Sequence, residues 1–126
     1  MVKKIEMKMI NIVGTECLPE VEEKFNKWYN EDHAAVLIKF PGLLKITRFK
    51  MIEKQNPHDT IQKFNTHYPK YITIYEFESE EAFHAYDVSK EYAEAHKKLV
   101  ETWGSTVREF NTRWRVQYEP IAFFSK

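Results

Sequence analysis

The feature that most constrains the fold is that three strand-like segments carry apolar residues on both of their faces. These segments are Ile5–Val13, Leu43–Glu53 and Tyr71–Phe77. A strand with one face in water alternates apolar and polar residues, whereas a strand covered on both faces does not. We therefore expect a sheet that is covered on both sides.

Two helical segments lie between the strand-like segments. The first starts at about Pro19 or Glu20 and is stopped by Pro41-Gly42, because proline suits a first turn and Pro-Gly ends a helix. The second follows Ser79 as N-cap, has a predicted break near Asp87–Ser89 and ends at Gly104, a typical C-terminal residue. In the last strand, Phe110–Tyr118, alternation places Phe110, Thr112 and Trp114 on one face and Arg113 and Arg115 on the other.

This order predicts a single α+β domain over residues 1–126, with a βαββαβ arrangement and a four-stranded antiparallel sheet. Two helices can cover only one face of that sheet. We expect the same face of a second copy to cover the other, which gives a homodimeric α/β barrel. In the alternative, the segment Ile121–Phe124 folds back over the sheet. The polar loop 54–69 either covers a site or is a connection only.

Composition excludes several classes of function. The 126 residues include 19 basic and 19 acidic side chains, so no net charge attracts nucleic acid or an anionic membrane. No stretch approaches a membrane span and no secretory signal is visible, so we expect a cytoplasmic protein. Cys17 is the only cysteine, which leaves no disulfide or cysteine-based zinc site, and we expect no metal. With three glycines, the chain has no phosphate-binding loop.

The first helix holds the most informative polar residues. At 100° per residue from Phe25, Asp32 falls inside the apolar stripe and His33 falls at its edge. A histidine at the rim of an apolar pocket can act as a general acid or base. In the alternative, Asp32 caps a short helix over 34–39 and His33 only makes a hydrogen bond at the corner.

Further candidates come from the same helix and from the strands. Tyr29 lies on the helix side of His33 and can donate a hydrogen bond to a ligand oxygen. Arg48 shares a strand face with Leu44 and Ile46, where it reaches either Glu76 across the sheet or an anionic ligand. The same two possibilities hold for other aromatic and basic residues, which either stabilise the core or line a ligand site: Trp28, Tyr75, Trp103 and Arg113.

The segment Phe25-Asn-Lys-Trp-Tyr-Asn-Glu-Asp-His33, continued by Phe40-Pro-Gly-Leu43, resembles EthD-like proteins of the ferredoxin-like, dimeric α/β-barrel superfamily. The resemblance implies a barrel pocket for a small aromatic or polyketide-like molecule and no cofactor. Such proteins often have Ile-Pro after the histidine, and this chain has Ala34-Ala35. We therefore expect a more helical turn after His33.

A second, local resemblance covers Glu78–Phe83 and Glu94–Lys97 and is to antibiotic-biosynthesis-type monooxygenases, including the haem-degrading branch. It implies His96 as haem ligand and Asn11 beside it, although Tyr86 stands where that branch has a tryptophan.

These observations leave three functions open. The first is a cofactor-independent oxygenase, cyclase or isomerase in which His33 moves a proton, Tyr29 assists and Arg48 or Tyr75 stabilises an oxyanion. The second is a non-catalytic ligand-binding or accessory protein. The third is a haem-binding monooxygenase that uses His96.

Overall fold

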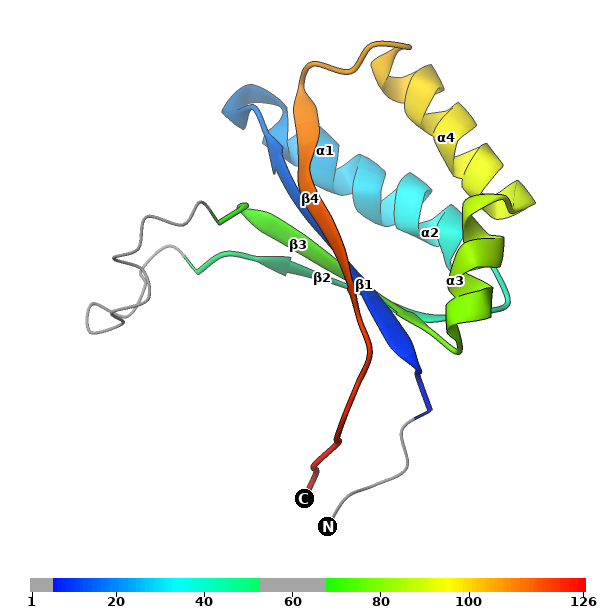
Figure 1. Cartoon of the computed structure of the whole chain (residues 1–126). Coiled ribbons are helices and arrows are strands. Elements are labelled where there is room, and N and C mark those ends of the chain that lie inside the picture. Colours follow the sequence, from blue (N-terminus) through cyan, green and yellow to red (C-terminus); the bar gives the residue numbers. More distant parts are fainter. Residues whose placement is uncertain (1–5, 53–67) are drawn as a thin grey trace.

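In the computed structural model, which describes residues 6–52 and 68–126, a four-stranded sheet lies against one layer of helices (Figure 1). The bounds of the elements, in chain order, are β1 Met9–Cys17, η1 Pro19–Val21, α1 Glu22–Trp28, η2 Tyr29–His33, α2 Ala34–Leu37, β2 Leu43–Lys50, β3 Tyr71–Phe77, α3 Glu80–Asp87, α4 Lys90–Trp103 and β4 Phe110–Tyr118.

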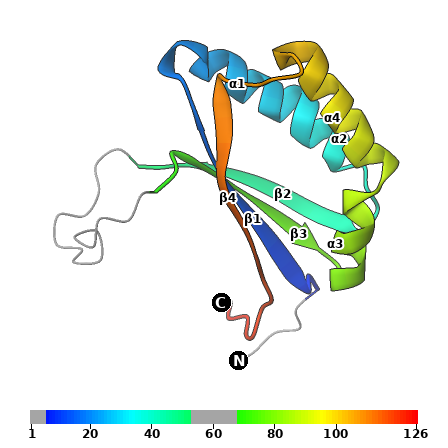
Figure 2. The same cartoon turned by 45° about the horizontal axis from the view of Figure 1, so that its top comes forward.

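The strands are antiparallel and follow the order β2-β3-β1-β4, so β2 and β4 are the edges. All helices lie on the same side of the sheet, and its other face is not covered by any of them (Figures 1 and 2). This architecture confirms the predicted βαββαβ order and the antiparallel sheet. Most of the predicted loop 54–69 lies outside the described residues.

The first strand lies further along the chain than the pattern predicted. β1 runs from Met9 to Cys17, beyond the predicted end at Val13, and its pairing with β4 shifts between Gly14 and Thr15. Gly14 pairs with Trp114 whereas Thr15 pairs with Thr112, so Arg113 is an extra residue on β4. A Cβ atom at position 14 would lie 2.6 Å from Pro69 Cγ and 3.0 Å from the Trp114 ring, which explains why glycine stands there.

The bulge exchanges the faces of β4 halfway along the strand, because one extra residue shifts the alternation of side chains by one. Thr112 before the bulge and Arg115 after it therefore both face the helices, while Trp114 faces the open side. The prediction that Thr112 and Trp114 share a face opposite Arg115 was wrong.

A second irregularity lies at the start of β2. Leu43 is buried and Leu44 is 46% exposed, because the pairing with β3 shifts between Leu43 and Lys45. Leu44 therefore does not share the inner face with Ile46, contrary to the prediction. The predicted pair of Arg48 with Glu76 does not form either, since Arg48 lies opposite Thr73.

The second helical region breaks where it was predicted to break. The Ser79 side chain accepts a hydrogen bond from the Ala82 N–H at 2.9 Å and caps α3. Ser89 caps α4 in the same way, through the Tyr92 N–H at 3.1 Å. Gly104 ends α4 with a φ of 90°, a conformation that glycine adopts at little cost. The two serine caps thus divide one continuous apolar pattern into two helices, α3 and α4.

The first helix is anchored to β3 by a polar network at one end of the sheet. The Tyr71 hydroxyl donates to Glu22 at 2.6 Å and accepts from the Asn26 amide at 3.0 Å. Lys70 also pairs with Glu22, at 2.5 Å. The network fixes α1, and hence the residues that follow it, relative to the sheet.

The core between helices and sheet consists of two clusters. The first gathers around Phe77, Leu37 and Tyr86, and the second is aromatic and gathers around Phe25, Trp28 and Trp103. Phe25 and Phe77 have no exposed surface, and burying a phenylalanine stabilises a fold by about 1.5–3 kcal/mol.

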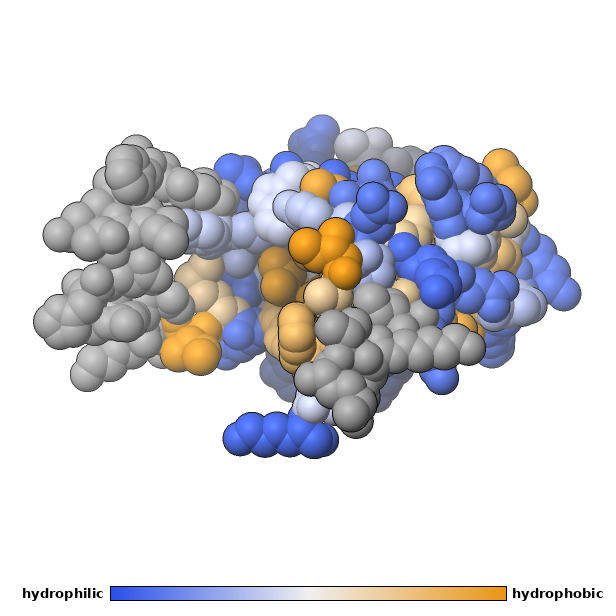
Figure 3. Space-filling view, turned by 60° about the horizontal axis from the view of Figure 1, so that its bottom comes forward, coloured by the Kyte–Doolittle hydropathy of each residue, from blue (hydrophilic) through white to orange (hydrophobic). Residues whose placement is uncertain are grey.

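Apolar side chains remain exposed elsewhere. Phe49, Trp114 and Tyr118 are 46%, 39% and 55% exposed. Ile121 and Phe124 are 95% and 71% exposed, so the C-terminal segment does not cover the sheet in the way the alternative prediction required. Figure 3, in which the bottom of the view of Figure 1 comes forward, shows apolar surface interrupting the hydrophilic surface near the middle of that side.

Candidate functional site

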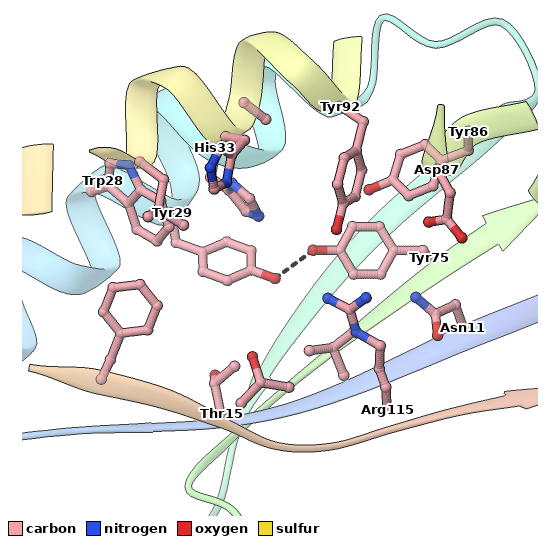
Figure 4. A pocket seen from close by; sticks show the side chains of 16 residues that line it. Asn11, Thr15, Trp28, Tyr29, His33, Tyr75, Tyr86, Asp87, Tyr92 and Arg115 are labelled. Carbon is pink, nitrogen blue, oxygen red and sulfur yellow. Dashed lines mark hydrogen bonds between the residues drawn. The ribbon is translucent and has the colours of Figure 1, made fainter. Parts of the chain in front are cut away.

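A cavity of about 120 Å³ lies between the sheet and the helix layer (Figure 4). Its floor comes from β1, β3 and β4, and its roof from α1, η2, α3 and α4. Aromatic side chains dominate the lining, namely Trp28, Tyr29, Tyr75, Tyr86, Tyr92 and Phe110. Four residues of the lining are exposed and form its solvent rim, namely Asp87, His96, Thr112 and Arg115.

The η2 segment directs the side chain of His33 into this cavity. Tyr29–His33 is a π-helical turn in which the Ala34 N–H donates to the Tyr29 carbonyl, five residues back instead of four. A wide turn of this kind holds one more residue than an α-helical turn, so the residues after it are rotated by about 100°. His33 thereby takes the inward position that a regular helix gives to Asp32.

The structure confirms the expected helical turn after His33, since α2 begins at Ala34. The alternative in which Asp32 caps that helix is wrong, because α2 has no side-chain cap and its flanking residues keep helical backbone angles. Asp32 does not line the cavity.

His33 is held between two aromatic rings. Its imidazole stacks on Trp28 with a centroid distance of 4.8 Å and meets the edge of Tyr29 at 4.9 Å. Burial, together with the positive charges of Arg48 and Arg115, lowers the pKa of His33 from 6.5 to about 4. The imidazole is therefore neutral at pH 7, and it can accept a proton only when an anion forms beside it.

A hydrogen-bonded pair of tyrosines forms one wall of the cavity. The hydroxyl groups of Tyr29 and Tyr75 are joined by a short hydrogen bond (Figure 4). Burial raises the pKa of Tyr29 and raises that of Tyr75 well above 10. Burial also raises the pKa of Tyr86. These phenols are therefore hydrogen-bond donors and not bases at neutral pH.

Arg115 brings a positively charged side chain to the lining of the cavity. It rises from β4 toward the space below His33 (Figure 4). Burial alone lowers the pKa of Arg115, but the Tyr92 hydroxyl and the Asp87 carboxylate raise it overall. Among the described residues no carboxylate lies close enough to Arg115 for an ion pair. Its charge is available to a bound anion.

Three buried polar atoms of the cavity lining have no hydrogen-bond partner in the part of the chain that the structure describes. They are Thr15 Oγ1, Trp28 Nε1 and His33 Nδ1. A buried polar group without a hydrogen-bond partner costs about 1–3 kcal/mol. Such groups are therefore expected where a ligand or a water molecule forms the missing hydrogen bond.

Arg48 lies outside the cavity, on the far side of Tyr29. Its guanidinium stacks over the Tyr29 ring at 4.2 Å and donates to Asn30 Oδ1 at 2.9 Å. Its Nε and Nη2 atoms are buried without a partner among the described residues, and burial lowers its pKa. It reaches the cavity only through Tyr29.

Two other candidates also lie outside the cavity. Arg113 is the extra residue of the β4 bulge and pairs with Glu16 at 3.8 Å. Trp103 packs in the aromatic cluster, edge-on to Trp28 at 5.9 Å. Cys17 is free, and burial raises its pKa, which disfavours the thiolate. Of the predicted site residues, six line the cavity, namely Asn11, Trp28, Tyr29, His33, Tyr75 and His96.

The residues proposed for haem do not fit that group. His96 is exposed at the rim, and the Asn11 amide oxygen already accepts a hydrogen bond from Gln117 at 2.8 Å. The cavity of about 120 Å³ is smaller than the roughly 300–1,000 Å³ that enclose a drug-sized ligand, let alone a porphyrin. We derive no step through haem.

Arg115 and Thr15 line the cavity although the sequence pattern did not predict either of them there. Arg115 was assigned to the opposite face of its strand, and Thr15 lay beyond the predicted end of the first strand at Val13. The signal for both was Gly14 beside a strand that continues with Thr15 and Glu16, because glycine inside a strand often marks a bulge.

Within residues 6–52 and 68–126, no helix is long and apolar enough to cross a membrane. In the same ranges, no group of three or more His, Cys, Asp or Glu side chains is arranged to hold a metal ion.

The strand order, the antiparallel pairing and the helices on one face define a ferredoxin-like α+β protein, with a cavity between the layers. The model of one protein family, described as a domain of unknown function (DUF4286), matches residues 8–117. The chain therefore belongs to the DUF4286 family. No curated protein matches it in sequence.

Solved structures of low sequence identity share the fold. An EthD-family protein from Bacillus halodurans C-125 has a TM-score of 0.59 and 15% identity, over 90% of this chain and 99% of that chain. A variant of MhuD with two manganese protoporphyrin IX molecules per active site has a TM-score of 0.65 and 14% identity, over 94% and 99%. SnoaB, a cofactor-independent oxygenase from Streptomyces nogalater, has a TM-score of 0.58 and 12% identity, over 90% and 93%. Both predicted resemblances are thus confirmed at the level of the fold.

Proposed function

We propose that the cavity binds a small aromatic molecule and that His33 exchanges a proton with it. The observation that carries this proposal is that Thr15 Oγ1, Trp28 Nε1 and His33 Nδ1 are buried, lack partners among the described residues and belong to three residues that line one cavity. A site that only filled a core would satisfy such groups or replace them by apolar ones.

The charges around His33 define what proton transfer requires. An imidazole with a pKa of about 4 is a weak base, so it takes a proton only from a group whose anion is stabilised at the same moment. Arg115 supplies that stabilisation, and no carboxylate among the described residues forms an ion pair with it. Proton removal of this kind can begin oxygenation, cyclisation or isomerisation. SnoaB, which shares the fold, is described as a cofactor-independent oxygenase.

The second candidate is a protein that binds the same ligand without converting it. The low pKa of His33 favours this candidate, because a base matched to its task has a pKa near the working pH.

We also propose that the chain is a homodimer in which the uncovered sheet faces pack together. The support is the exposed apolar surface of Phe49, Trp114 and Tyr118 on the face that no helix covers. Cytoplasmic location remains a proposal as well, which fractionation of cells that express the tagged protein tests.

Native mass spectrometry of the purified protein, followed by incubation of any bound molecule with the protein in air, tests the function. A catalyst converts the molecule, and His33→Asn retains binding but loses conversion. His84→Asn is the matched control, since His84 is exposed, lies outside the cavity and pairs with Glu80 at 3.5 Å. Conversion that survives in His33→Asn contradicts the assigned role. Binding without conversion in either protein favours the second candidate, and a protein that takes up no aromatic compound contradicts the whole proposal.

A further inference from the structure

The last residues of the chain carry large apolar side chains that the fold leaves in solvent. Ile121, Phe123 and Phe124 are 95%, 46% and 71% exposed. They belong to the segment 119–126, here called the C-terminal arm, which follows β4 and extends away from the helix layer (Figures 1 and 2). Three exposed side chains of this size within four residues are costly in water, so we expect another surface to cover them.

The arm continues a stretch of chain that begins on the open face of the sheet. Tyr118, the last residue of β4, pairs with Ile10 on β1, and directly opposite residues of neighbouring strands lie on the same face. Tyr118 is 55% exposed, and Trp114 on the same face is 39% exposed. The exposed apolar residues from Trp114 to Phe124 thus lead from the open face into the arm without a break in the chain.

The exposed apolar area of this face and of the arm together is close to what a stable interface requires. A large side chain presents roughly 200 Å² when fully exposed, so Phe49, Trp114 and Tyr118 leave about 300 Å² in solvent. On the same scale, the three apolar side chains of the arm add about 400 Å². A stable interface takes about 800 Å² from each partner. The arm therefore contributes more than the large side chains of the sheet itself.

A second copy of the chain is the occupant that suits both surfaces. The arm does not cover the sheet of its own chain, since its apolar side chains stay exposed. In a pair with two-fold symmetry, each copy receives the same segment that it gives. Pairing through the sheet edges is disfavoured instead, because β2 carries the exposed residues Lys45 and Lys50 and the pairing of β4 is irregular.

Building on the proposed homodimer, we propose that the C-terminal arm of each copy packs against the open sheet face of the other copy, with Ile121, Phe123 and Phe124 as its anchors. A reciprocal exchange closes at two copies and leaves no arm for a third. One well-buried anchor residue commonly changes the affinity of an interface by about thirtyfold or more. The loss of all three anchors should therefore weaken the dimer strongly.

Sedimentation equilibrium of the full-length protein measures the dissociation constant of the dimer. In the triple variant Ile121→Ser, Phe123→Ser, Phe124→Ser, we expect this constant to rise by at least about a hundredfold. Val88→Ser is the control, because Val88 is 86% exposed between α3 and α4, on the helix side of the molecule. It should leave the dissociation constant unchanged. Circular dichroism establishes that each variant is folded.

Hydrogen exchange followed by mass spectrometry locates the arm. In the wild-type protein, the amides of residues 119–126 should exchange more slowly at protein concentrations above the dissociation constant than below it. The triple variant, compared at the same concentrations, should show fast exchange in this segment throughout.

A triple variant that dimerises as tightly as wild type overturns the inference and leaves the proposed homodimer standing. Arm amides that exchange equally slowly at every concentration place the arm on its own chain, which also overturns the inference. Association that continues beyond the dimer contradicts a reciprocal exchange. A wild-type protein that is monomeric at every concentration contradicts both the inference and the proposed homodimer.

Discussion

The two faces of the sheet carry different kinds of side chain. On the face toward the helices, β1 presents Asn11 and Thr15 among apolar residues, and β4 presents Arg115. On the open face, β1 presents Ile10 and Ile12, which are aliphatic. β3 likewise has buried Thr73 and Tyr75 toward the helices, and Ile72 and Ile74 on the open face.

A monomeric sheet in water has apolar residues under the helices and polar ones in solvent, and both faces of this sheet depart from that pattern in part. This difference indicates that the two faces of the sheet have different functions. Polar groups under the helices are costly unless a site uses them, and an aliphatic open face is costly unless something covers it.

The largest effect is expected on the open face. Ile74→Asp, at the centre of the sheet, should weaken the proposed dimer by more than about a hundredfold, because burying an unpaired charge costs several kcal/mol. Sedimentation equilibrium measures the change. Val88→Asp is the control, since Val88 is 86% exposed between α3 and α4. A wild-type protein that sediments as a monomer contradicts the proposal that a second copy of the chain covers this face.

On the covered face, His33 should make the free energy of unfolding depend on pH. Its folded-state pKa of about 4 lies below the unfolded value of 6.5, so the unfolded chain binds the proton first as the pH falls. Stability should therefore fall between pH 6.5 and pH 4, by up to about 3 kcal/mol.

Urea unfolding at fixed protein concentration measures this slope. His33→Asn should lose most of it and His84→Asn should keep it. An unchanged slope in His33→Asn means that another group titrates.

The tyrosine pair gives the next effect. Tyr75→Phe leaves the buried Tyr29 hydroxyl without its partner, which should cost about 1–3 kcal/mol. The double variant with Tyr29→Phe should cost less than the sum of the single variants, because both hydroxyls are then gone. Tyr118→Phe on the open face is the comparison and should change stability by less than about 0.5 kcal/mol. Chemical denaturation checks all of them, and strictly additive losses contradict the pairing.

The smallest effect is expected at Arg48. Arg48→Met removes two buried nitrogens without partners, which favours the variant, and loses the stacking on Tyr29 and the bond to Asn30, which disfavours it. The two changes nearly cancel, so stability should stay within about 1 kcal/mol of wild type. Thermal unfolding measures it. A loss as large as that of Tyr75→Phe indicates that the guanidinium has a partner in solution.

The sequence predicted the elements whose signals are local. Ser79, Ser89 and Gly104 mark helix ends through their own hydrogen bonds or backbone preferences, and each lies where it was expected. The site depended instead on three irregularities, at Gly14, Leu44 and Tyr29–His33. Each changes the phase of a strand or helix by about one residue, and each is fixed by packing against another element. Regular periodicity therefore placed Asp32 inward and Arg115 outward, whereas the fold does the reverse.

The π turn at Tyr29–His33 has a consequence for how this site can change over evolution. Because the turn depends on the number of residues in it, substitutions alter the chemistry of His33 but leave its direction fixed. A single deletion within the turn restores a regular helix and rotates a different side chain into the cavity. Proteins that share this scaffold can therefore exchange an imidazole for a neighbouring residue by a change in length alone, without altering any strand.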